Sequence, residues 1–273
     1  MSDTPILTDR TALRLHRVRA AAKPSLFLHE DAAIEIQERL EEVNKTYNAP
    51  LLIGHATDPL RALFPDARRI EDTPTLDIER GSHDLVLHLF GLHWADDPVG
   101  QLVQSRLALQ PDGLLMAIMF GGTTLQELRA TVADVETRVM GGLSPRILPM
   151  ADLRDLGALL HRAGLALPVA DSRKLKVRYP DLATLVRDLR SMGETNALAA
   201  RHRASVPRDF FREVEAVYRA RFSEEDYLIA TFELVFLTGW APDASQPQPL
   251  RPGSAKARLA DALGVDETPL KRE

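Results

Sequence analysis

The stretch LLIGHATDP, Leu51 to Pro59, decides the fold because it joins a short apolar run to a turn. Three consecutive large aliphatic residues are typical of a buried β-strand. The turn that follows holds a single glycine, Gly54, and then Thr57 and Asp58, which are common residues at helix N-caps. The stretch therefore predicts a strand, a turn and the start of a helix. Nucleotide-binding α/β domains begin in this way, but their turn usually contains more glycine.

Further apolar runs alternate with amphipathic segments through the first half of the chain. The runs 84–90 (DLVLHLF) and 114–120 (LLMAIMF) are apolar at nearly every position, as strands buried on both faces are. Apolar residues recur at helical spacing between Val99 and Leu107, and again in the segment 29–43. This alternation predicts an α/β fold: a Rossmann-like, mostly parallel sheet with helices on both faces.

The second half continues with helices and strands and then changes character. We expect helices over 150–164, 180–193 and 208–222, strands at LPVADS and KLKVRY, and a long strand over 227–240. After Trp240 the chain is rich in proline and small polar residues. We therefore divide it into a domain at 1–240 and a proline-rich tail at 241–273, with a short helix in SAKARLADALG.

Composition narrows the function classes. The chain has 273 residues, 45% of them hydrophobic, and a net charge of −5, which gives no general argument for a nucleic-acid partner. It contains no cysteine, which excludes disulfides, thiolate metal sites and a cysteine nucleophile. No apolar run is long enough for a membrane span, and the first ten residues lack the apolar core of a signal peptide. The basic segment 10–23 imitates a transit peptide, but we interpret it as a helix of the fold and expect a cytoplasmic protein.

Four segments carry a resemblance to a known family. They are LHWADDP at 92–98, LQPDGLLMAIMFGGTTLQELR at 109–129, GGLSPRILPMADLRDLGALLHRAG at 141–164 and DLRSMGETNAL at 188–198. Together they resemble the class I S-adenosylmethionine (SAM) methyltransferase fold. The branch they resemble contains a mitochondrial complex I assembly factor and is similar to the malonyl-carrier-protein methyltransferases of biotin synthesis. The resemblance implies SAM as cofactor, and a protein substrate or a respiratory complex subunit as partner. It also implies a link to arginine hydroxylation.

The first strand departs from the pattern of this family. The family pattern places an acid before the first glycine and two further glycines after it. Here those positions hold Leu52, Ala56 and Asp58, and only Gly54 remains. The glycines let the backbone approach the cofactor without a Cβ clash, so their loss weakens the predicted cradle of Gly54, His55 and Ala56. We favour a helix N-cap as the role of Thr57 or Asp58.

The segment between the first strand and His83 is too short for a complete βαβ unit. It has room for a short helix and for one or two short strands. Glu71 or Asp72 is a candidate for the acid that holds the ribose, and Asp77 and Glu79 resemble the acid pair on the adenine side. Solvated loop acids are the alternative for each, and the alternative that we favour.

Residues after the second apolar run are candidates for chemistry. Ligands bind at the carboxyl ends of parallel strands, so His93 is a candidate general base or substrate contact, with Trp94 beside it and Leu92 on the cofactor side. A structural His–Trp pair is the alternative for His93 and Trp94. We interpret His88, inside the strand, as a buried and hydrogen-bonded core histidine.

Three further motifs are candidates for substrate binding. Gly121, Gly122 and Thr124 open a helix whose backbone N–H groups suit an anionic group, although a tight turn with a Thr124–Glu127 capping box explains them equally well. The remaining candidates come from the GGLSPR and MGETN motifs; they are Arg146, Glu194 and Asn196. Each of these alternatively fixes loop geometry. The eight histidines show no metal-ligand spacing.

Three functions remain open. The first is a SAM-dependent methyltransferase, whose chemistry demands orientation more than particular side chains. The second is a protein-modifying enzyme of the hydroxylase type. The third is a pseudo-methyltransferase scaffold that binds a protein partner after loss of the cofactor half. An open pocket at the ends of the first two apolar strands favours an enzyme, and a pocket filled by His55 or Leu52 favours the scaffold.

Overall fold

The computed structural model describes residues 6–203 and 206–247. The helices are α1 (Arg10–Ala20), α2 (Phe27–Val43), α3 (Asp58–Ala62), α4 (Pro98–Ala108), α5 (Gln126–Met140), α6 (Leu153–Arg162), α7 (Leu182–Met192) and α8 (Arg208–Phe222), with a 3₁₀ turn η1 (Leu92–Trp94). The strands are β1 (Pro50–Gly54), β2 (Arg68–Ile70), β3 (His83–Leu89), β4 (Leu109–Phe120), β5 (Ala166–Tyr179), β6 (Ser223–Glu224) and β7 (Tyr227–Trp240). Every strand predicted from the sequence is present, although LPVADS and KLKVRY belong to the single strand β5.

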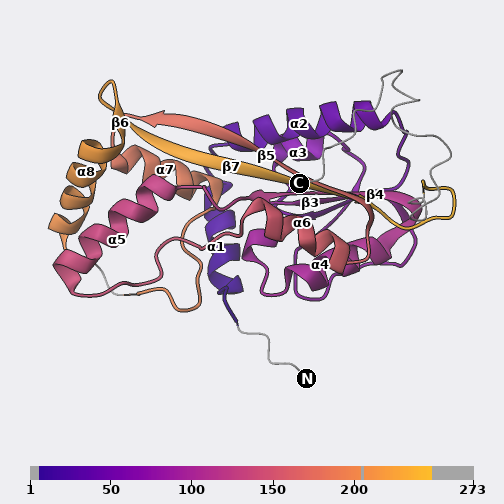
Figure 1. The fold of residues 1–273 in the computed structure, drawn as a ribbon, viewed down its shortest axis with the longest axis horizontal. Coiled ribbons are helices and arrows are strands. Elements are labelled where there is room, and N and C mark those ends of the chain that lie inside the picture. The colour runs from indigo at the N-terminus through magenta and orange to yellow at the C-terminus, as the bar shows by residue number, and fades with distance from the viewer. Residues whose placement is uncertain (1–5, 204–205, 248–273) are drawn as a thin grey trace, which may run out of the picture. The chain divides into compact units, whose positions relative to one another are not determined.

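The strands form one mixed sheet in the order β2-β1-β3-β4-β7-β5, and β6 pairs with β7 (Figure 1). The first four strands are parallel, while β7 runs antiparallel to both β4 and β5. The predicted α/β fold is therefore confirmed, with a parallel half and an antiparallel half. The parallel half places the ends of β1, β2 and β3 at one edge of the sheet, where ligands bind in such folds.

Both faces of the sheet are buried, which explains the continuous apolar runs. Alternate residues belong to two separate cores: Leu52 and Leu87 to one, Leu51 and Val86 to the other. The first core includes residues of α2, and the second includes residues of α4 and α6. These helices lie on opposite sides of the sheet in Figure 1. Because successive side chains of a pleated strand point to opposite faces, each face of the sheet has its own core and its own layer of helices.

The short segment between β1 and β3 forms α3 and one strand, β2, parallel to β1. This confirms the expectation of a short helix with one or two short strands. Thr57 occupies the N-cap position of α3, but its hydroxyl makes no capping hydrogen bond. Asp72 follows β2 by two residues, so the sheet brings it to the same edge as Gly54.

The observed ends of the helices can be compared with the capping residues predicted from the sequence. Asp181 caps α7 by accepting a hydrogen bond from the Thr184 N–H, and Gly193 ends the helix with φ +82°, as predicted. The predicted capping box at the start of α5 is wrong, because that helix begins at Gln126. The Thr124 hydroxyl instead donates to a backbone carbonyl of β7, and the Glu127 carboxylate accepts from β7. Both side chains anchor α5 to the sheet instead of capping it.

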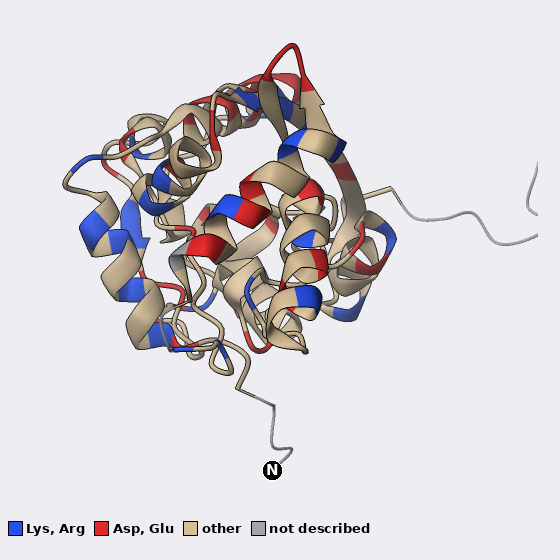
Figure 2. Cartoon of the chain, turned by 90° about the vertical axis from the view of Figure 1, so that its left-hand side faces the viewer, with Lys and Arg blue, Asp and Glu red and all other residues tan. Residues whose placement is uncertain are grey.

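The end formed by α5 and α8 lies away from the parallel edge of the sheet. Acidic and basic side chains are interspersed there (Figure 2), and Arg138 pairs with Glu213. Contacts divide the chain into one unit at Met1–Pro242 and a second at Asp243–Glu273. The helix predicted in SAKARLADALG lies outside the described residues. Among the described helices, none has the length and apolarity needed to cross a membrane.

Candidate functional site

Two of the hollows at the edge of the sheet where the parallel strands end contain most of the predicted site residues. We call the first the basic groove; it has about 570 Å³ of room and is lined by α1, α3, the turn after β1 and the residues at the end of β2. We call the second the apolar pocket; it has about 140 Å³ of room between η1, the start of α5, the loop 146–150, α7 and the loop after α7. Most of the predicted cofactor residues fall at the first hollow, and most predicted substrate residues fall at the second.

The turn after β1 forms one wall of the basic groove. Gly54 has φ +91°, and a Cβ atom there would lie 2.6 Å from the Leu89 carbonyl oxygen. The His55 N–H donates to that same carbonyl over 2.8 Å, so the turn is tied to the end of β3. Only glycine fits this backbone conformation at this close approach. Gly54, His55 and Ala56 all line the groove, where the sequence placed them.

Asp72 is the buried anion at the floor of the groove. Its carboxylate lies 3.1 Å from the Arg10 guanidinium and 3.2 Å from that of Arg17. Burial raises its pKa, but Arg17 and Arg10 outweigh burial and lower the pKa to about 2. Arg17 also donates to the Phe90 carbonyl over 2.8 Å. The interpretation of Asp72 as a solvated loop acid is therefore wrong, because two arginines of α1 cover it.

The other acids predicted for the cofactor lie differently. Glu71 lines the groove but is exposed, as the loop interpretation expects. Asp77 is exposed and pairs with Arg68 over 2.9 Å, outside the lining of the groove. Glu79 is exposed as well. Leu92 is buried in the core beneath α4 and lines neither hollow. The structure therefore does not bring Asp77 and Leu92 together with Gly54.

Arginines dominate the lining of the basic groove, and none of them is among the residues predicted from the sequence. They are Arg10, Arg14, Arg17, Arg61 and Arg69. Three of these recur on α1 at spacings of four and three, which is a stripe on one helical face. That spacing is the signal that could have revealed the groove. The two acids in the lining are Glu71 and Asp72.

This groove does not fit SAM as its side chains stand. The carboxylate of Asp72, a predicted candidate for the ribose, already pairs with two arginines, and the surrounding charge is positive, whereas SAM carries a cationic sulfonium. Gly54 retains the backbone geometry of a cradle, but Ala56 and Asp58 replace the other glycines. SAM as the cofactor remains a prediction from the family.

Aromatic rings lie between the two hollows. His29 is fully buried, with its ring centroid 4.5 Å from that of Phe90 and 5.5 Å from that of His55. The Phe120 ring lies 5.2 Å from both Phe90 and His93. Burial lowers the pKa of His29 to about 3 and that of His55 to about 4, so both rings are neutral at pH 7. We call these five side chains the ring cluster.

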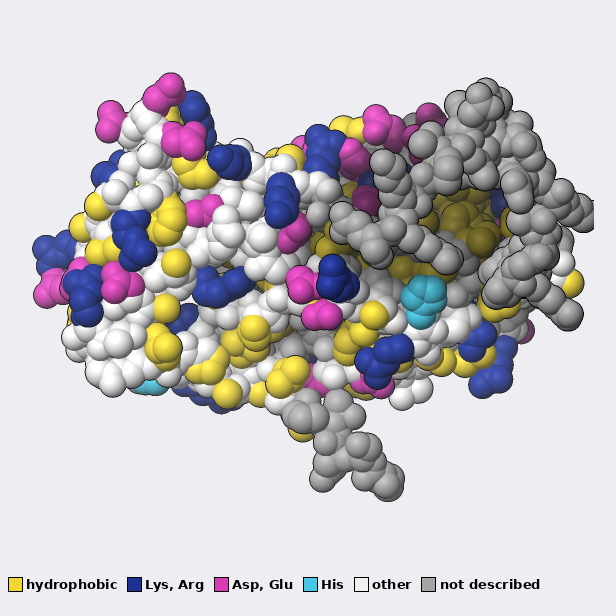
Figure 3. Space-filling model, in the orientation of Figure 1, with side chains coloured by type: hydrophobic (Ala, Val, Ile, Leu, Met, Phe, Trp, Pro, Cys, Tyr) yellow, Lys and Arg dark blue, Asp and Glu magenta, His cyan; other side chains and the backbone are white. Residues whose placement is uncertain are grey.

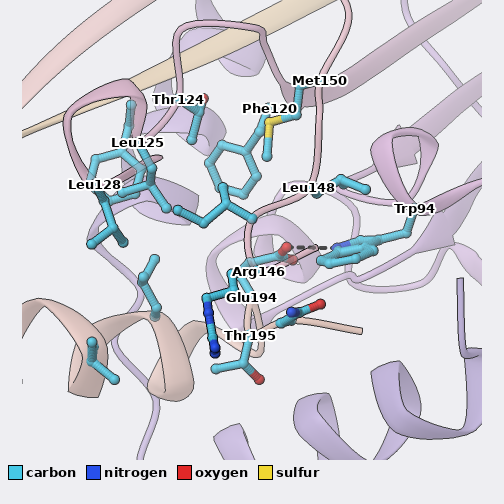
Figure 4. Close-up of a pocket in the computed structure, with 15 residues that line it drawn as sticks. Trp94, Phe120, Thr124, Leu125, Leu128, Arg146, Leu148, Met150, Glu194 and Thr195 are labelled. Carbon is cyan, nitrogen blue, oxygen red and sulfur yellow. Dashed lines mark hydrogen bonds between the residues drawn. The ribbon is translucent and has the colours of Figure 1, made fainter. Parts of the chain in front are cut away.

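The apolar pocket collects five of the predicted substrate residues (Figure 4). They are Trp94, Thr124, Arg146, Glu194 and Asn196. Aliphatic and aromatic side chains form the walls, among them Phe120, Leu125, Leu128, Leu148 and Met150. These residues come from segments far apart in the sequence, so the pocket exists only in the folded chain.

Glu194 is the charged group of this pocket. Its Oε2 atom accepts from the Trp94 indole over 2.7 Å and lies 3.1 Å from His93 Nε2. Burial raises its pKa, but His93, Arg17 and Trp94 outweigh burial and lower the pKa to about 2. Its other oxygen, Oε1, is buried and has no hydrogen-bond partner within residues 6–203 and 206–247. The pocket thus contains an ionised carboxylate with one free acceptor.

His93 takes part in this arrangement as a buried side chain. It contacts Glu194 and Phe120, and its Nδ1 atom has no partner in the described part of the chain. Its catalytic role remains a prediction, because His93 lines neither hollow. His88 is fully buried and its Nε2 lies 3.2 Å from Gln101 Oε1, which confirms it as a hydrogen-bonded core histidine.

Two residues of the apolar pocket also hold loops in place. Arg146 pairs with the buried carboxylate of Glu136 over 2.8 Å. Asn196 donates to the Pro145 carbonyl over 2.7 Å and so ties the loop after α7 to the loop before α6. The charge of Arg146 is therefore already balanced.

Gly121 and Gly122 do not present their turn to a ligand. The Gly121 N–H donates to the Glu233 carbonyl, and the N–H and hydroxyl of Thr123 donate to the Glu233 carboxylate over 2.9 and 2.8 Å. The anion predicted for this turn is the chain's own Glu233. Gly121 also packs tightly, because a Cβ atom there would lie 2.7 Å from a Val235 methyl group.

Metal ligands do not gather in the described residues. No group of three or more His, Asp or Glu side chains is placed to hold a metal ion within residues 6–203 and 206–247.

Comparison with known proteins places the chain among relatives of two kinds. It is 34% identical over 229 residues to arginine-hydroxylase NDUFAF5, mitochondrial, of Rattus norvegicus, covering 84% of this chain and 66% of that protein. It is 31% identical to the protein of the same name from Danio rerio, covering 86% of this chain and 81% of that protein. It is 33% identical to a malonyl-[acyl-carrier protein] O-methyltransferase of Laribacter hongkongensis, covering 71% of this chain and 64% of that protein.

Family models and solved structures add little to the relationship that these relatives show. The chain spans about two thirds of the length of the rat relative. No protein-family model matches it. A crystal structure of a putative methyltransferase from Bacillus halodurans covers 76% of this chain and 99% of its own, with 12% identity and a TM-score of 0.48. At that score the likeness adds nothing to what the sheet order already shows.

Proposed function

Because the chain belongs to the SAM-methyltransferase-fold family that includes arginine-hydroxylase NDUFAF5 and the malonyl-[acyl-carrier protein] O-methyltransferases, we propose that it acts on a protein substrate. In this proposal an arginine side chain of the substrate enters the apolar pocket. The free oxygen of Glu194 carries the proposal, because a buried, ionised carboxylate with an unused acceptor attracts a cationic donor.

The walls of the apolar pocket suit such a side chain. An arginine has a long methylene stem and a planar guanidinium with five N–H donors. Leu125, Leu128 and Met150 offer apolar contacts for the stem. The Trp94 indole and Glu194 point toward one another in Figure 4, so the carboxylate is held in one orientation. Arg146 does not compete, because Glu136 already pairs with it.

The name of the rat relative, arginine-hydroxylase NDUFAF5, supports an arginine substrate. The resemblance of the sequence to a complex I assembly factor supports a subunit of respiratory complex I as the partner. In the proposed complex, Glu194 binds the guanidinium, and Trp94 and His93 orient the carboxylate. The apolar walls exclude water from the contact, which strengthens the attraction between the charges.

A non-catalytic scaffold is the second candidate. The ring cluster favours it, because His29, His55 and Phe90 occupy the region between the basic groove and the apolar pocket. In a scaffold the arginine would bind in the same pocket and leave unmodified.

Calorimetric titration of the full chain with N-acetyl-arginine N-methylamide tests the proposal. The citrulline counterpart has nearly the same shape without the charge, so it should bind about tenfold or more weakly. The variant Glu194→Gln should lose this preference, and Glu79→Gln, at an exposed position, should keep it. Trp94→Phe leaves the carboxylate and should retain part of the preference.

Two results would contradict the proposal. One is equal affinity for arginine and citrulline in the wild type. The other is an unchanged preference in Glu194→Gln, provided that circular dichroism shows the variant to be folded. Mass spectrometry of an arginine-bearing complex I peptide after incubation then separates an enzyme from a scaffold, since only an enzyme changes the mass of the peptide.

A further inference from the structure

We propose that the basic groove binds a small anionic ligand that carries phosphate groups, in the place where relatives of this fold hold SAM. The groove is lined by α1, the turn at Gly54 and the end of β2. It is separate from the apolar pocket, so this inference does not depend on the proposed arginine substrate.

The charge of the groove differs from that of the chain as a whole. The chain has a net charge of −5, and on the face seen in Figure 3 acidic and basic side chains lie close to one another. The groove instead gathers five arginines against two carboxylates, an excess of three positive charges. A concave surface lined by one sign of charge concentrates ligands of the opposite sign.

The five arginines divide into two sets. Arg10 and Arg17 are committed to Asp72, and they close the floor of the groove. Arg14 and Arg69 are exposed and make no ion pair or side-chain hydrogen bond with any described residue. Arg61 pairs only with Asp58, which is itself largely exposed. Among the described residues, two guanidinium groups are therefore unpaired and a third has only an exposed partner, above a floor in which two arginines and one carboxylate leave one further positive charge.

Guanidinium groups and phosphates are complementary in geometry. The planar fork of arginine donates two parallel hydrogen bonds to two oxygens of a phosphate, and clusters of arginine recognise phosphate groups for this reason. The room in the groove lies within the range of small-molecule sites. This size favours a compact phosphate compound over an extended polymer.

The same features oppose SAM. Its sulfonium would lie among like charges, and the ribose would find the Asp72 carboxylate already paired with Arg10 and Arg17. Releasing Asp72 would break the contacts of a buried carboxylate with Arg10 and Arg17, which is costly. A phosphate ligand requires no such rearrangement.

Isothermal titration of the full chain tests the inference, with pyrophosphate, ADP, ATP, SAM and S-adenosylhomocysteine as separate probes. We expect pyrophosphate to bind and SAM to bind more weakly. The double variant Arg14→Gln/Arg69→Gln should weaken pyrophosphate binding about tenfold or more, since it removes two charge-assisted contacts. The matched control is Arg162→Gln, an exposed arginine of α6 outside the groove, which should change nothing.

The nucleotide probes identify the source of the phosphate. Tighter binding of ADP than of pyrophosphate indicates a nucleotide, and equal binding indicates recognition of phosphate alone; both support the inference. It is overturned if SAM binds more tightly than every phosphate compound, or if the double variant binds pyrophosphate as the wild type does. Tighter, variant-sensitive binding of a single-stranded RNA oligonucleotide would also overturn it, in favour of a polymer.

Discussion

His29 should make the folded chain sensitive to mild acid. Its ring is fully buried among Phe90 and His55, and neither ring nitrogen has a partner among the described residues. The charged and titratable groups that face it are Arg17, Glu194 and the neighbouring histidines His55 and His93. Burial lowers its pKa from 6.5 to about 3 in the folded state. The unfolded chain therefore binds a proton that the folded chain excludes, and stability falls as the pH falls below 6.5.

The size of the effect follows from the two pKa values. With 6.5 in the unfolded state and about 3 in the folded state, lowering the pH from 7 to 5 should cost roughly 2 kcal/mol of unfolding free energy at His29 alone. The variant His29→Leu removes this proton-binding site at similar volume and breaks no hydrogen bond. Between pH 7 and pH 5, the variant should therefore lose roughly 2 kcal/mol less unfolding free energy than the wild type loses.

Urea unfolding at pH 7 and pH 5, followed by circular dichroism, measures the difference. His202→Leu, at an exposed position, is the control and should behave as the wild type does. If His29→Leu and the wild type lose the same free energy between the two pH values, the reasoning from burial is refuted.

Two further substitutions test the basic groove. Asp72→Asn removes a buried carboxylate that faces two arginines and should lower the unfolding free energy by about 3 kcal/mol in urea titrations, whereas Asp77→Asn at an exposed pair should change it by less than about 1 kcal/mol. Similar losses in both would contradict the burial of Asp72. Gly54→Ala should lower the melting temperature far more than Gly81→Ala: both glycines have positive φ, but only at Gly54 would a Cβ atom meet the Leu89 carbonyl, at 2.6 Å. Equal shifts would show that φ alone sets the cost.

The strands and most helices could be predicted because their signals are local. Buried parallel strands need apolar residues on both faces, and Leu85–Leu89 and Leu114–Phe120 display this directly. Asp181 and Gly193 mark the ends of α7 through their own side-chain and backbone preferences. The capping box at Thr124 failed, because its local signal was outweighed by hydrogen bonds to β7, more than 100 residues away.

For the same reason, the sequence could indicate the edge of the sheet at which residues that follow strands lie. Gly54 and Asp72 meet at one hollow there, and Trp94 lies at the other. The chemical environment of each residue was not predictable. Asp72 looked like one of several loop acids until α1 placed Arg17 beside it.

The sequence by itself determined the alternation of helices and strands, the parallel edge and the family, because periodicity, turn residues and motifs are properties of contiguous segments. Only the tertiary structure decided which charges are paired and which remain free. Arg17 and Asp72 lie 55 residues apart in the sequence, and Trp94 and Glu194 lie 100 apart. The pKa and the function of a carboxylate depend on the partners that folding brings to it. Local sequence patterns do not show which distant residues will be close in space.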